Sequence, residues 1–311
     1  MNIQQFQYVL AVAENRHFET AADKCFVTQS TLSTMISKFE DEIGIQIFDR
    51  KKKPVEITTE GKLILEQLKV IASTIEQLGE LTSEIKGDIK GNLSIAVLPT
   101  IAPFLLPLFL QNFAARFPNL HITVREQTTE EIVRQIKSRD LDIGIISIPV
   151  QVPDILEYKL YDEPFVFYDA TQKGQGPISI RKMNMDNLCL LEEGHCMRTQ
   201  VMKLCDLHKR SIHSNLNFEY KAGSIDSLLR FVKSNKATTL LPFLATVGMP
   251  ASENELLSQF ADPVPYRTIG AVVHRHFVKK KILDMLQKEI ITHVSLHLPV
   301  LKVKGKKLNP V

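Results

Sequence analysis

The chain has little cysteine, no long apolar run and no strong excess of charge of one sign. Four cysteines in 311 residues are too few for a disulfide scaffold, and the cytosol keeps structural thiols reduced. No apolar run approaches the ~20 residues that a membrane span needs, and the first residues lack the basic and apolar stretches of a secretory signal. We therefore expect a cytoplasmic protein without a membrane partner, in which any disulfide is transient or regulatory.

Motifs for cofactors and metals are missing as well. No segment carries a phosphate-binding glycine-rich loop or a metalloprotease motif, so we expect no cofactor and no metal. The net charge is only +3, and residues 1–60 carry seven Lys or Arg against nine Asp or Glu. DNA binding must therefore be argued from where the charges lie. A chain of 311 residues exceeds the size at which one core usually stops growing, which predicts more than one domain.

Residues 1–60 are predicted to form a DNA-binding domain. Apolar residues at helical spacing predict a first helix from Ile3 to Ala13, a second over 18–25 and a third capped by Thr28. The third helix is apolar on one face and carries short hydrogen-bonding side chains on the other, which suits entry into a major groove. A basic cluster at 50–53 and a short strand at 55–58 follow, so a winged helix-turn-helix is expected. The alternative is three ordinary helices with a solvated polar face.

The motifs of this region resemble the signature of the LysR-type transcriptional regulators. The matching stretches are Ala21-Ala22, Thr28-Gln29-Ser30-Thr31-Leu32-Ser33, Phe39 to Gly44, Phe48-Asp49-Arg50 and Thr58-Thr59-Glu60-Gly61. The resemblance implies that double-stranded promoter DNA faces Gln29, Ser30, Thr31, Ser33, Thr34 and Lys38, with Arg50 and Lys51 at the wing. Family members often carry Arg where this chain has Thr34, so a different readout of base edges is expected here.

Residues 61–90 are predicted to form a long helix through which two chains associate. Its seam steps by four and three with one polar interruption, over Ile64, Leu68, Ile71, Ile75, Leu78, Thr82, Ile85 and Ile89. Such alternation over about four heptads is typical of a coiled-coil helix. It favours self-association as a dimer, or a tetramer built from dimers, over packing against the chain's own surface. Gly87 and Gly91 mark a hinge at the end of the seam.

Residues 91–300 alternate predicted strands and helices. Strands are expected at 93–98, 121–126 and 142–147, with helices over 103–117 and 130–138 between them, and a second set begins at 224. This order predicts an α/β fold with a parallel sheet, two lobes and a ligand cleft at the strand ends. The LysR resemblance implies the same architecture, a periplasmic-binding-protein-like effector domain. Residues 301–311 form a basic tail that is expected to be solvated and disordered.

Cys196 and Cys205 are the most distinctive chemical feature. Cys196 follows His195 and lies two residues before Arg198, where positive charge is expected to lower the thiol pKa. A thiolate attacks peroxide to give a sulfenic acid, which a second thiol, here Cys205, converts into a disulfide. In a helix, nine residues separate two Cα atoms by about 13.5 Å, whereas a disulfide tolerates at most about 7 Å. Bonding would therefore remodel the segment, as a regulatory switch requires.

Other interpretations of these cysteines remain open. Cys205 is also compatible with an ordinary buried position in a helix. Zinc is a second alternative, although no C-x-x-C spacing supports it; its ligands would be His195, Cys196, Cys205 and His208. Cys25 and Cys189 are expected to be structural, because both lie in apolar surroundings.

The segment Gly194-His195-Cys196-x-Arg198 with Cys205 resembles the peroxide-sensing members of the LysR family, and the likeness covers essentially the whole chain. It implies that Cys196 reacts with hydrogen peroxide and that Cys205 resolves the product. It also implies a peroxide pocket formed by Thr100, Thr128, His195, Arg198 and Arg267. Thr199 replaces an acidic residue that is frequent in these members, and residues 169–184 are divergent.

The function implied is that of a regulator and not of an enzyme. Hydrogen peroxide would be the signal, antioxidant genes the targets, RNA polymerase a partner, and a thiol reductant would reset the switch. One rival is a LysR-type regulator that answers a small organic effector in the cleft. The other is a thiol peroxidase or a zinc protein, against which the order of the LysR motifs argues.

Overall fold

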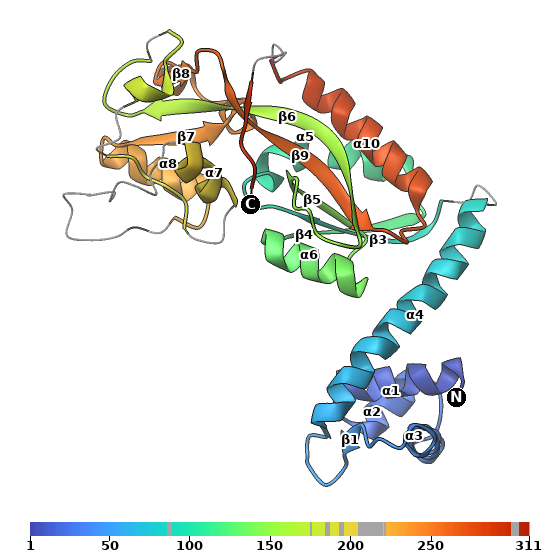
Figure 1. Ribbon diagram of the computed structural model, residues 1–311. Coiled ribbons are helices and arrows are strands. Elements are labelled where there is room, and N and C mark those ends of the chain that lie inside the picture. Colours follow the sequence, from blue (N-terminus) through green and yellow to red (C-terminus); the bar gives the residue numbers. More distant parts are fainter. Residues whose placement is uncertain are drawn as a thin grey trace. The chain divides into compact units, whose positions relative to one another are not determined.

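The structure is a computed structural model that describes residues 1–85, 89–174, 176–183, 187–192, 196–204, 220, 222–299 and 305–310. The described residues up to Ile85, together with Ser138–Asp140, form one compact unit, and the others form a second (Figure 1). His195, Cys205, His208 and Gly87 lie outside the described residues. The predictions that concern these four residues therefore stay predictions. No helix within the described ranges is long and apolar enough to cross a membrane.

The first unit is a winged helix-turn-helix followed by a long helix, as predicted. Its elements are α1 (Ile3–Asn15), α2 (Phe18–Lys24), α3 (Gln29–Ile43), a ribbon of β1 (Phe48–Asp49) and β2 (Glu56–Ile57), and α4 (Thr59–Ile85). Thr28 caps α3 by accepting a hydrogen bond from the backbone N–H of Thr31. Gly44 ends the same helix with a φ of 69°, a left-handed conformation in which glycine carries no steric penalty.

Helix α4 begins after a single residue, Thr58, that follows the ribbon. The Thr58 hydroxyl donates to the Gln46 carbonyl and accepts from the Gly61 N–H. A Cβ added at Gly61 would come within 2.5 Å of the Ile47 carbonyl oxygen, so only glycine permits this approach. The start of the long helix is thereby fixed to the turn that follows α3.

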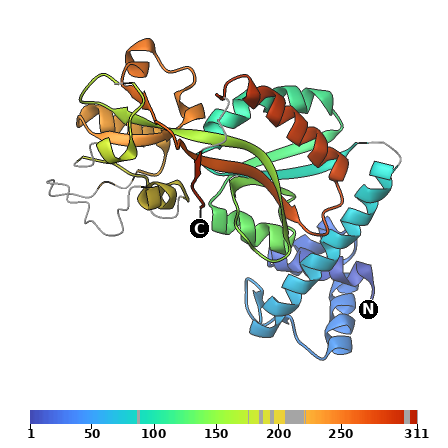
Figure 2. The ribbon, with the colours of Figure 1, turned by 45° about the horizontal axis from the view of Figure 1, so that its top comes forward.

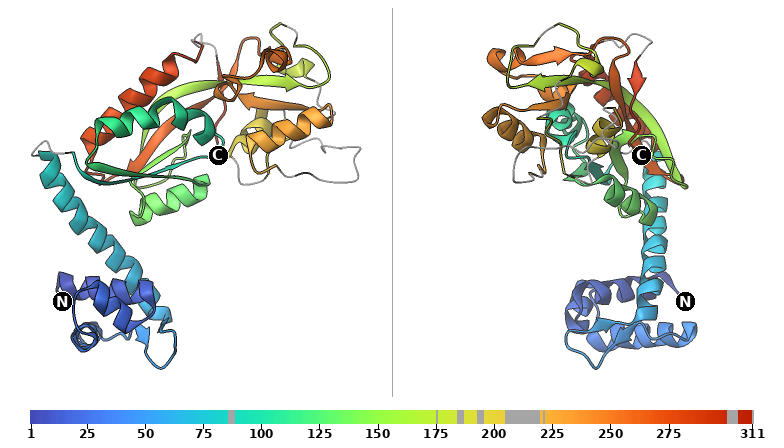
Figure 3. Two further views of the ribbon diagram at one scale, coloured as in Figure 1. Left: turned by 180° about the vertical axis from the view of Figure 1, so that it is seen from behind. Right: turned by 60° about the vertical axis from the view of Figure 1, so that its left-hand side comes forward.

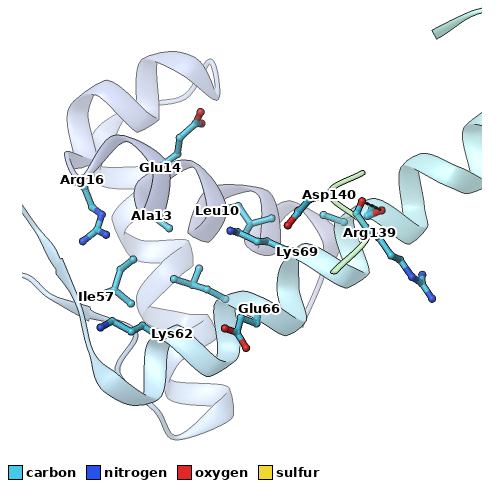
Figure 4. A pocket seen from close by; sticks show the side chains of 13 residues that line it. Leu10, Ala13, Glu14, Arg16, Ile57, Lys62, Glu66, Lys69, Arg139 and Asp140 are labelled. Atoms are coloured by element: carbon cyan, nitrogen blue, oxygen red, sulfur yellow. Dashed lines mark hydrogen bonds between the residues drawn. The ribbon is translucent and has the colours of Figure 1, made fainter. Parts of the chain in front are cut away.

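The side chains of α4 that are described as packing against the chain's own core lie in its first turns. Leu65 and Leu68 are 6% and 3% exposed and join the core of the helix-turn-helix, whereas Ile71 and Leu78 remain 39% and 63% exposed. The predicted seam is thus corrected in part, because Leu68 is already covered within one chain. A pocket of about 800 Å³ lies beside these turns and has a mixed apolar and charged lining (Figure 4).

The second unit has two lobes joined by two long strands (Figures 1 and 2). The first lobe contains β3 (Gly91–Val97), α5 (Ala102–Arg116), β4 (Leu120–Glu126), α6 (Thr129–Ser138), β5 (Ile143–Ile148) and α10 (Lys280–Ser295). Strand β3 pairs in parallel with both β4 and β5, which confirms the predicted βαβαβ unit. Helices α5 and α10 cover one face of the sheet and α6 covers the other (Figures 1 and 3).

The joining strands are β6 (Ile155–Asp169) and β9 (Pro265–His274), which run antiparallel to one another. Strand β9 pairs with β5 of the first lobe, and the second half of β6 pairs with β7 and β8 of the second lobe. The second lobe contains η1 (Ile180–Lys182), α7 (Cys196–Leu204), α8 (Ile225–Ser234), β7 (Thr238–Pro242), η3 (Phe243–Thr246), α9 (Ala251–Asn254) and β8 (Leu257–Gln259).

The C-terminal residues correct one prediction. Strand β10 (Lys306–Lys307) pairs in parallel with the start of β9. The backbone N–H groups of Lys306 and Leu308 donate to the carbonyls of Val264 and Tyr266, each at 2.8 Å. Leu308 is 4% exposed. A solvated, disordered tail is therefore wrong for residues 305–310, because strand pairing and burial of Leu308 hold them.

Two leucines of α4 provide a matched test of this packing. Leu68→Ala should lower the stability of the first unit by about 2–5 kcal/mol, because it leaves a cavity in a closed core. Leu63→Ala makes the same chemical change at a side chain that is 66% exposed, and should shift stability by no more than about 0.5 kcal/mol. Hydrogen exchange at the amides of α1 in the full-length protein measures both effects. Equal losses in the two variants would contradict the assignment of Leu68 to the core.

Candidate functional site

The exposed face of α3 carries the residues expected to meet DNA. Its opposite face is buried through Leu32, Ile36 and Phe39, which leaves the other side of the helix open. Exposed side chains there are Gln29, Ser30, Thr31, Thr34 and Lys38, while Ser33 is half-buried. The Thr28 hydroxyl also lies 3.0 Å and 2.9 Å from the hydroxyls of Ser30 and Thr31. The start of α3 is thus a cluster of hydroxyl groups, which can donate to phosphates or base edges.

Arg50 and Lys51, both predicted at the wing, have different surroundings. The Arg50 guanidinium donates to the Ser33 hydroxyl at 3.0 Å and to the Glu40 carboxylate at 2.7 Å, and lies 5.2 Å from the centre of the Phe18 ring. The other oxygen of Glu40 accepts the backbone N–H groups of Ile47 and Phe48. Arg50 therefore ties the wing to α3, whereas Lys51 is exposed and makes its side-chain charge available to a phosphate.

Sequence reasoning missed Phe26. This side chain is 95% exposed, and its backbone has a φ of 55°. A large apolar side chain in the left-handed region is uncommon and points to a local constraint. Phe26 lies in the turn between α2 and α3, two residues before the cap of the predicted recognition helix. The sequence signal that could have identified it is a large aromatic residue in the short segment between two predicted helices.

Cys196 lies where the two lobes of the second unit meet. It is the first residue of α7, is 8% exposed, and packs into the apolar core of the first lobe. Met197, Val201 and Leu204 of the same helix belong to the core of the second lobe. The thiol and its own helix are therefore held by different cores. A change at the thiol acts directly on the junction between them.

Arg267 is the cation that the fold brings to this thiol. It is 1% exposed and stands directly opposite Glu163 in the pairing of β9 with β6. Its Nε donates to Glu163 at 2.8 Å, and its two terminal nitrogens donate to the hydroxyl and the carbonyl of Thr100 at 3.1 Å and 3.0 Å. The second carboxylate oxygen of Glu163 accepts the backbone N–H of Leu244. Glu163 was not predicted, and its placement depends wholly on the pairing of two distant strands.

The structure places Thr129, and not Thr128, beside Cys196. The Thr128 side chain is exposed and accepts the backbone N–H of Glu131 at the start of α6. The Thr129 hydroxyl oxygen is buried, has no hydrogen-bond partner of regular geometry among the described residues, and lies close enough to lower the thiol pKa. Arg198 is half-buried and donates to the Leu191 carbonyl at 2.9 Å.

Burial raises the pKa of the Cys196 thiol, because desolvation disfavours the thiolate. The Arg267 guanidinium, the Thr129 hydroxyl and the backbone N–H groups at the start of α7 oppose this effect but do not overcome it. The prediction of a lowered pKa is therefore wrong for this state, since the sequence does not reveal the depth of burial. Among the described residues, burial also raises the pKa of the free thiols of Cys25 and Cys189.

No group of three or more potential metal ligands occurs in the part of the chain that the structure describes. His195, Cys205 and His208, which the zinc interpretation requires, lie outside that part. The zinc interpretation therefore stays a hypothesis.

Family comparisons place the chain in a class of regulators. A model described as the LysR substrate binding domain matches residues 86–287, and a model of the lysR family of bacterial regulatory helix-turn-helix proteins matches residues 3–62. The chain belongs to the LysR family. It is accordingly a DNA-binding transcriptional regulator and not an enzyme.

Individual proteins similar to this chain point to one group within the LysR family. The chain is 30% identical over 308 residues to the hydrogen peroxide-inducible genes activator of Dickeya chrysanthemi, covering 98% of this chain and 100% of that protein. It is 31% identical over 275 residues to the DNA-binding transcriptional dual regulator OxyR of Escherichia coli K12, covering 88% and 89%. Full-length OxyR from Pseudomonas aeruginosa matches the structure with a TM-score of 0.74 and 27% identity, covering 97% and 100%. The chain is thus a LysR regulator similar to OxyR.

Arg267→Met tests the electrostatics of the thiol. Removal of the guanidinium should raise the pKa of Cys196 further, so its pH profile of alkylation should move to higher pH. The variant should also lose about 3–5 kcal/mol of stability, because Glu163 stays buried without a counter-charge. Mass-mapped alkylation across pH measures the first effect and chemical denaturation the second.

Arg198→Met is the matched control, since Arg198 donates to the Leu191 carbonyl and its change should leave the pH profile in place. A profile that moves in Arg198→Met and stays fixed in Arg267→Met would reverse the assignment.

Proposed function

We propose that this regulator senses hydrogen peroxide by forming a Cys196–Cys205 disulfide and thereby controls antioxidant genes. The observation that carries the proposal is the position of Cys196, at the first turn of α7 and in the core of the opposite lobe, with Arg267 as the neighbouring cation. The names of the relatives, hydrogen peroxide-inducible genes activators, support the choice of signal.

The chemistry requires two thiols and one peroxide. The Cys196 thiolate attacks one oxygen of hydrogen peroxide, the O–O bond breaks, and the second oxygen leaves as hydroxide and is protonated to water. The sulfur is then a sulfenic acid. Cys205 attacks that sulfur, the S–S bond forms, the S–O bond breaks, and a second water leaves. A thiol reductant returns the two electrons and restores both thiols.

Peroxide would be bound by the polar groups around the thiol. The Thr129 hydroxyl is buried and lacks a regular partner among the described residues, which leaves it able to bond a small polar molecule. Thr100 is 2% exposed, and its hydroxyl already accepts from Arg267. We therefore assign Thr100, Thr129 and Arg267 to the peroxide pocket, with His195 as a neighbour in the sequence.

Disulfide formation would convert this chemistry into a conformational change. Cys196 is the first residue of α7 and Leu204 the last, so an intact helix holds their Cα atoms about 12 Å apart. Cys205 follows Leu204 in the sequence by one Cα step of about 3.8 Å, which still leaves at least about 8 Å between the Cα atoms of the two cysteines. Because a disulfide tolerates at most about 7 Å, α7 must be remodelled. Met197, Val201 and Leu204 would then no longer pack in the core of the second lobe as they do here.

The same proposal assigns the output. The exposed face of α3 and Lys51 would contact double-stranded promoter DNA, and Arg50 would keep the wing in position. Exposed Ile71 and Leu78 on α4 support association into a dimer, or a tetramer of two dimers. Remodelling of the second unit would change the contacts between chains, the DNA half-sites engaged and the recruitment of RNA polymerase.

A mass-mapped thiol trap tests the sensing step. About one equivalent of peroxide should produce a Cys196–Cys205 bridge in the wild type and none in Cys196→Ser, because the sulfenic acid cannot form. Cys189→Ser is the matched control: that thiol is free and half-buried in the second lobe, and its loss should leave the bridge intact. If both thiols stay free in the wild type, a small organic effector becomes the better hypothesis.

Salt-dependent DNA binding tests the wing. Lys51→Ala should weaken binding to all sequences alike and reduce the slope of log K against log salt by about 1, since one phosphate contact is lost. Lys173→Ala makes the same change of charge at an exposed lysine of the second unit and should leave the slope unchanged. Identical slopes for wild type and Lys51→Ala would exclude the phosphate contact.

A further inference from the structure

The C-terminal residues bond to the two elements that carry the reactive centre. Through β10, Lys306 and Leu308 donate their backbone N–H groups to Val264 and Tyr266, next to Arg267 on β9. The Leu308 carbonyl accepts a hydrogen bond of 2.8 Å from the side chain of Gln200 on α7. One short segment therefore joins the strand of the cation to the helix of the thiol. The dark red trace of this segment ends beside α7 in Figures 1, 2 and 3.

Gln200 is the residue of α7 that receives this bond. It is fully buried and lies four residues after Cys196, hence on the same face of the helix. Its amide nitrogen donates both to Leu308 and to the Ser147 hydroxyl on β5, at 2.8 Å and 2.9 Å. Its amide oxygen has no hydrogen-bond partner among the residues that the structure describes. Gln200 thus fixes the face of α7 that carries the thiol to the first lobe and to the C-terminal segment together.

The start of this C-terminal segment, at Gly305, packs closely against β9. A Cβ added at Gly305 would come within 2.7 Å of the Tyr266 ring, so a side chain at this position would push the segment away from β9. Leu308 is buried in the core of the second lobe, which also holds Met197, Val201 and Leu204 of α7. Backbone pairing, a side-chain hydrogen bond and apolar packing all hold the segment in place.

We propose that residues Gly305–Pro310 form a clamp that holds α7 in the reduced arrangement, with Gln200 as the positioning residue through which it acts. The clamp keeps the first turn of α7 against the first lobe, where Cys196 meets Arg267. Remodelling of α7 must break the bond from Gln200 to Leu308, so the clamp is released when the disulfide forms. This second half rests on the proposed function, whereas the first half concerns the reduced protein alone.

The first half is tested without peroxide. Two full-length variants loosen the clamp independently: Gly305→Val displaces the segment from Tyr266, and Gln200→Met removes the hydrogen bond at similar side-chain volume. In each, the amides of α7 should exchange faster, and alkylation of Cys196 by iodoacetamide should accelerate about tenfold, as expected for the loss of one or two buried hydrogen bonds. Lys307→Ala is the control, because that side chain is exposed and the backbone pairing is retained.

The outcomes separate the two proposals. Unchanged exchange of α7 and unchanged alkylation of Cys196 in both variants would overturn the clamp, whatever peroxide does. The amides of β3 and β5 must stay protected in the same samples, so that a general loss of folding is recognised and not counted as release. After peroxide, exchange of residues 305–310 should rise in the wild type and not in Cys196→Ser. If the Cys196–Cys205 disulfide forms while residues 305–310 stay protected, the proposed release of the clamp is wrong. If the clamp variants loosen α7 but no disulfide forms after peroxide, the peroxide-sensing proposal is wrong and the clamp proposal stands.

Discussion

The buried ion pair of Arg267 and Glu163 is the contact on which the junction between the two lobes of the second unit depends. Both side chains are 1% exposed, so two charges have been taken out of water and each must find its partners inside. They do so across the paired strands β9 and β6, and the remaining hydrogen-bonding groups reach Thr100 and the backbone of Leu244. A buried pair of this kind is costly to form but very costly to break on one side only. It therefore specifies one arrangement of the segments that meet at the lobe junction.

The same pair defines the electrostatic surroundings of Cys196. The positive charge of Arg267 reaches the thiol, but it is shared with a carboxylate at 2.8 Å, and burial of the sulfur outweighs it. A thiol of this kind rests mainly in its protonated form. The protonated Cys196 thiol is a weak nucleophile. Once its proton has left, the N-terminus of α7 and the Arg267 guanidinium can stabilise the thiolate.

Much of the fold could be predicted from the sequence, because periodicity is local. The three helices of residues 1–60, the cap at Thr28 and the strands β3 to β5 follow from residue spacing alone. Strand β6 could not be recognised, because it carries charged residues in its first half and has an irregularity between Lys159 and Tyr161. Glu163, in the second half of this strand, belongs to no motif, so only the pairing of β6 with β9 reveals its role.

In the candidate site, too, the positions of single residues could not be predicted from the sequence. Thr128 and Thr129 are adjacent and chemically identical, and only the start of α6 decides which of them faces the thiol. Arg267 came from resemblance and not from any local pattern. The C-terminal lysines were interpreted as solvated because their side chains carry charge. The side chains of Lys306 and Lys307 are indeed exposed, yet the backbone of both residues pairs with β9. Backbone pairing cannot be recognised from a run of charged residues.

The junction at Gly61 has a consequence for the geometry of DNA binding. Since α4 starts against the Ile47 carbonyl with no room for even a methyl group, the long helix cannot swivel freely on the domain that it leaves. Its 27 residues make a rod of about 40 Å, longer than one turn of B-form DNA at about 34–36 Å. Because α4 is held stiffly at the helix-turn-helix, its length fixes the distance between that domain and the far end of the helix. When two such rods are joined, the distance between the sites they touch is set by the protein, and a spacer of the wrong length in the DNA must be accommodated by bending the duplex.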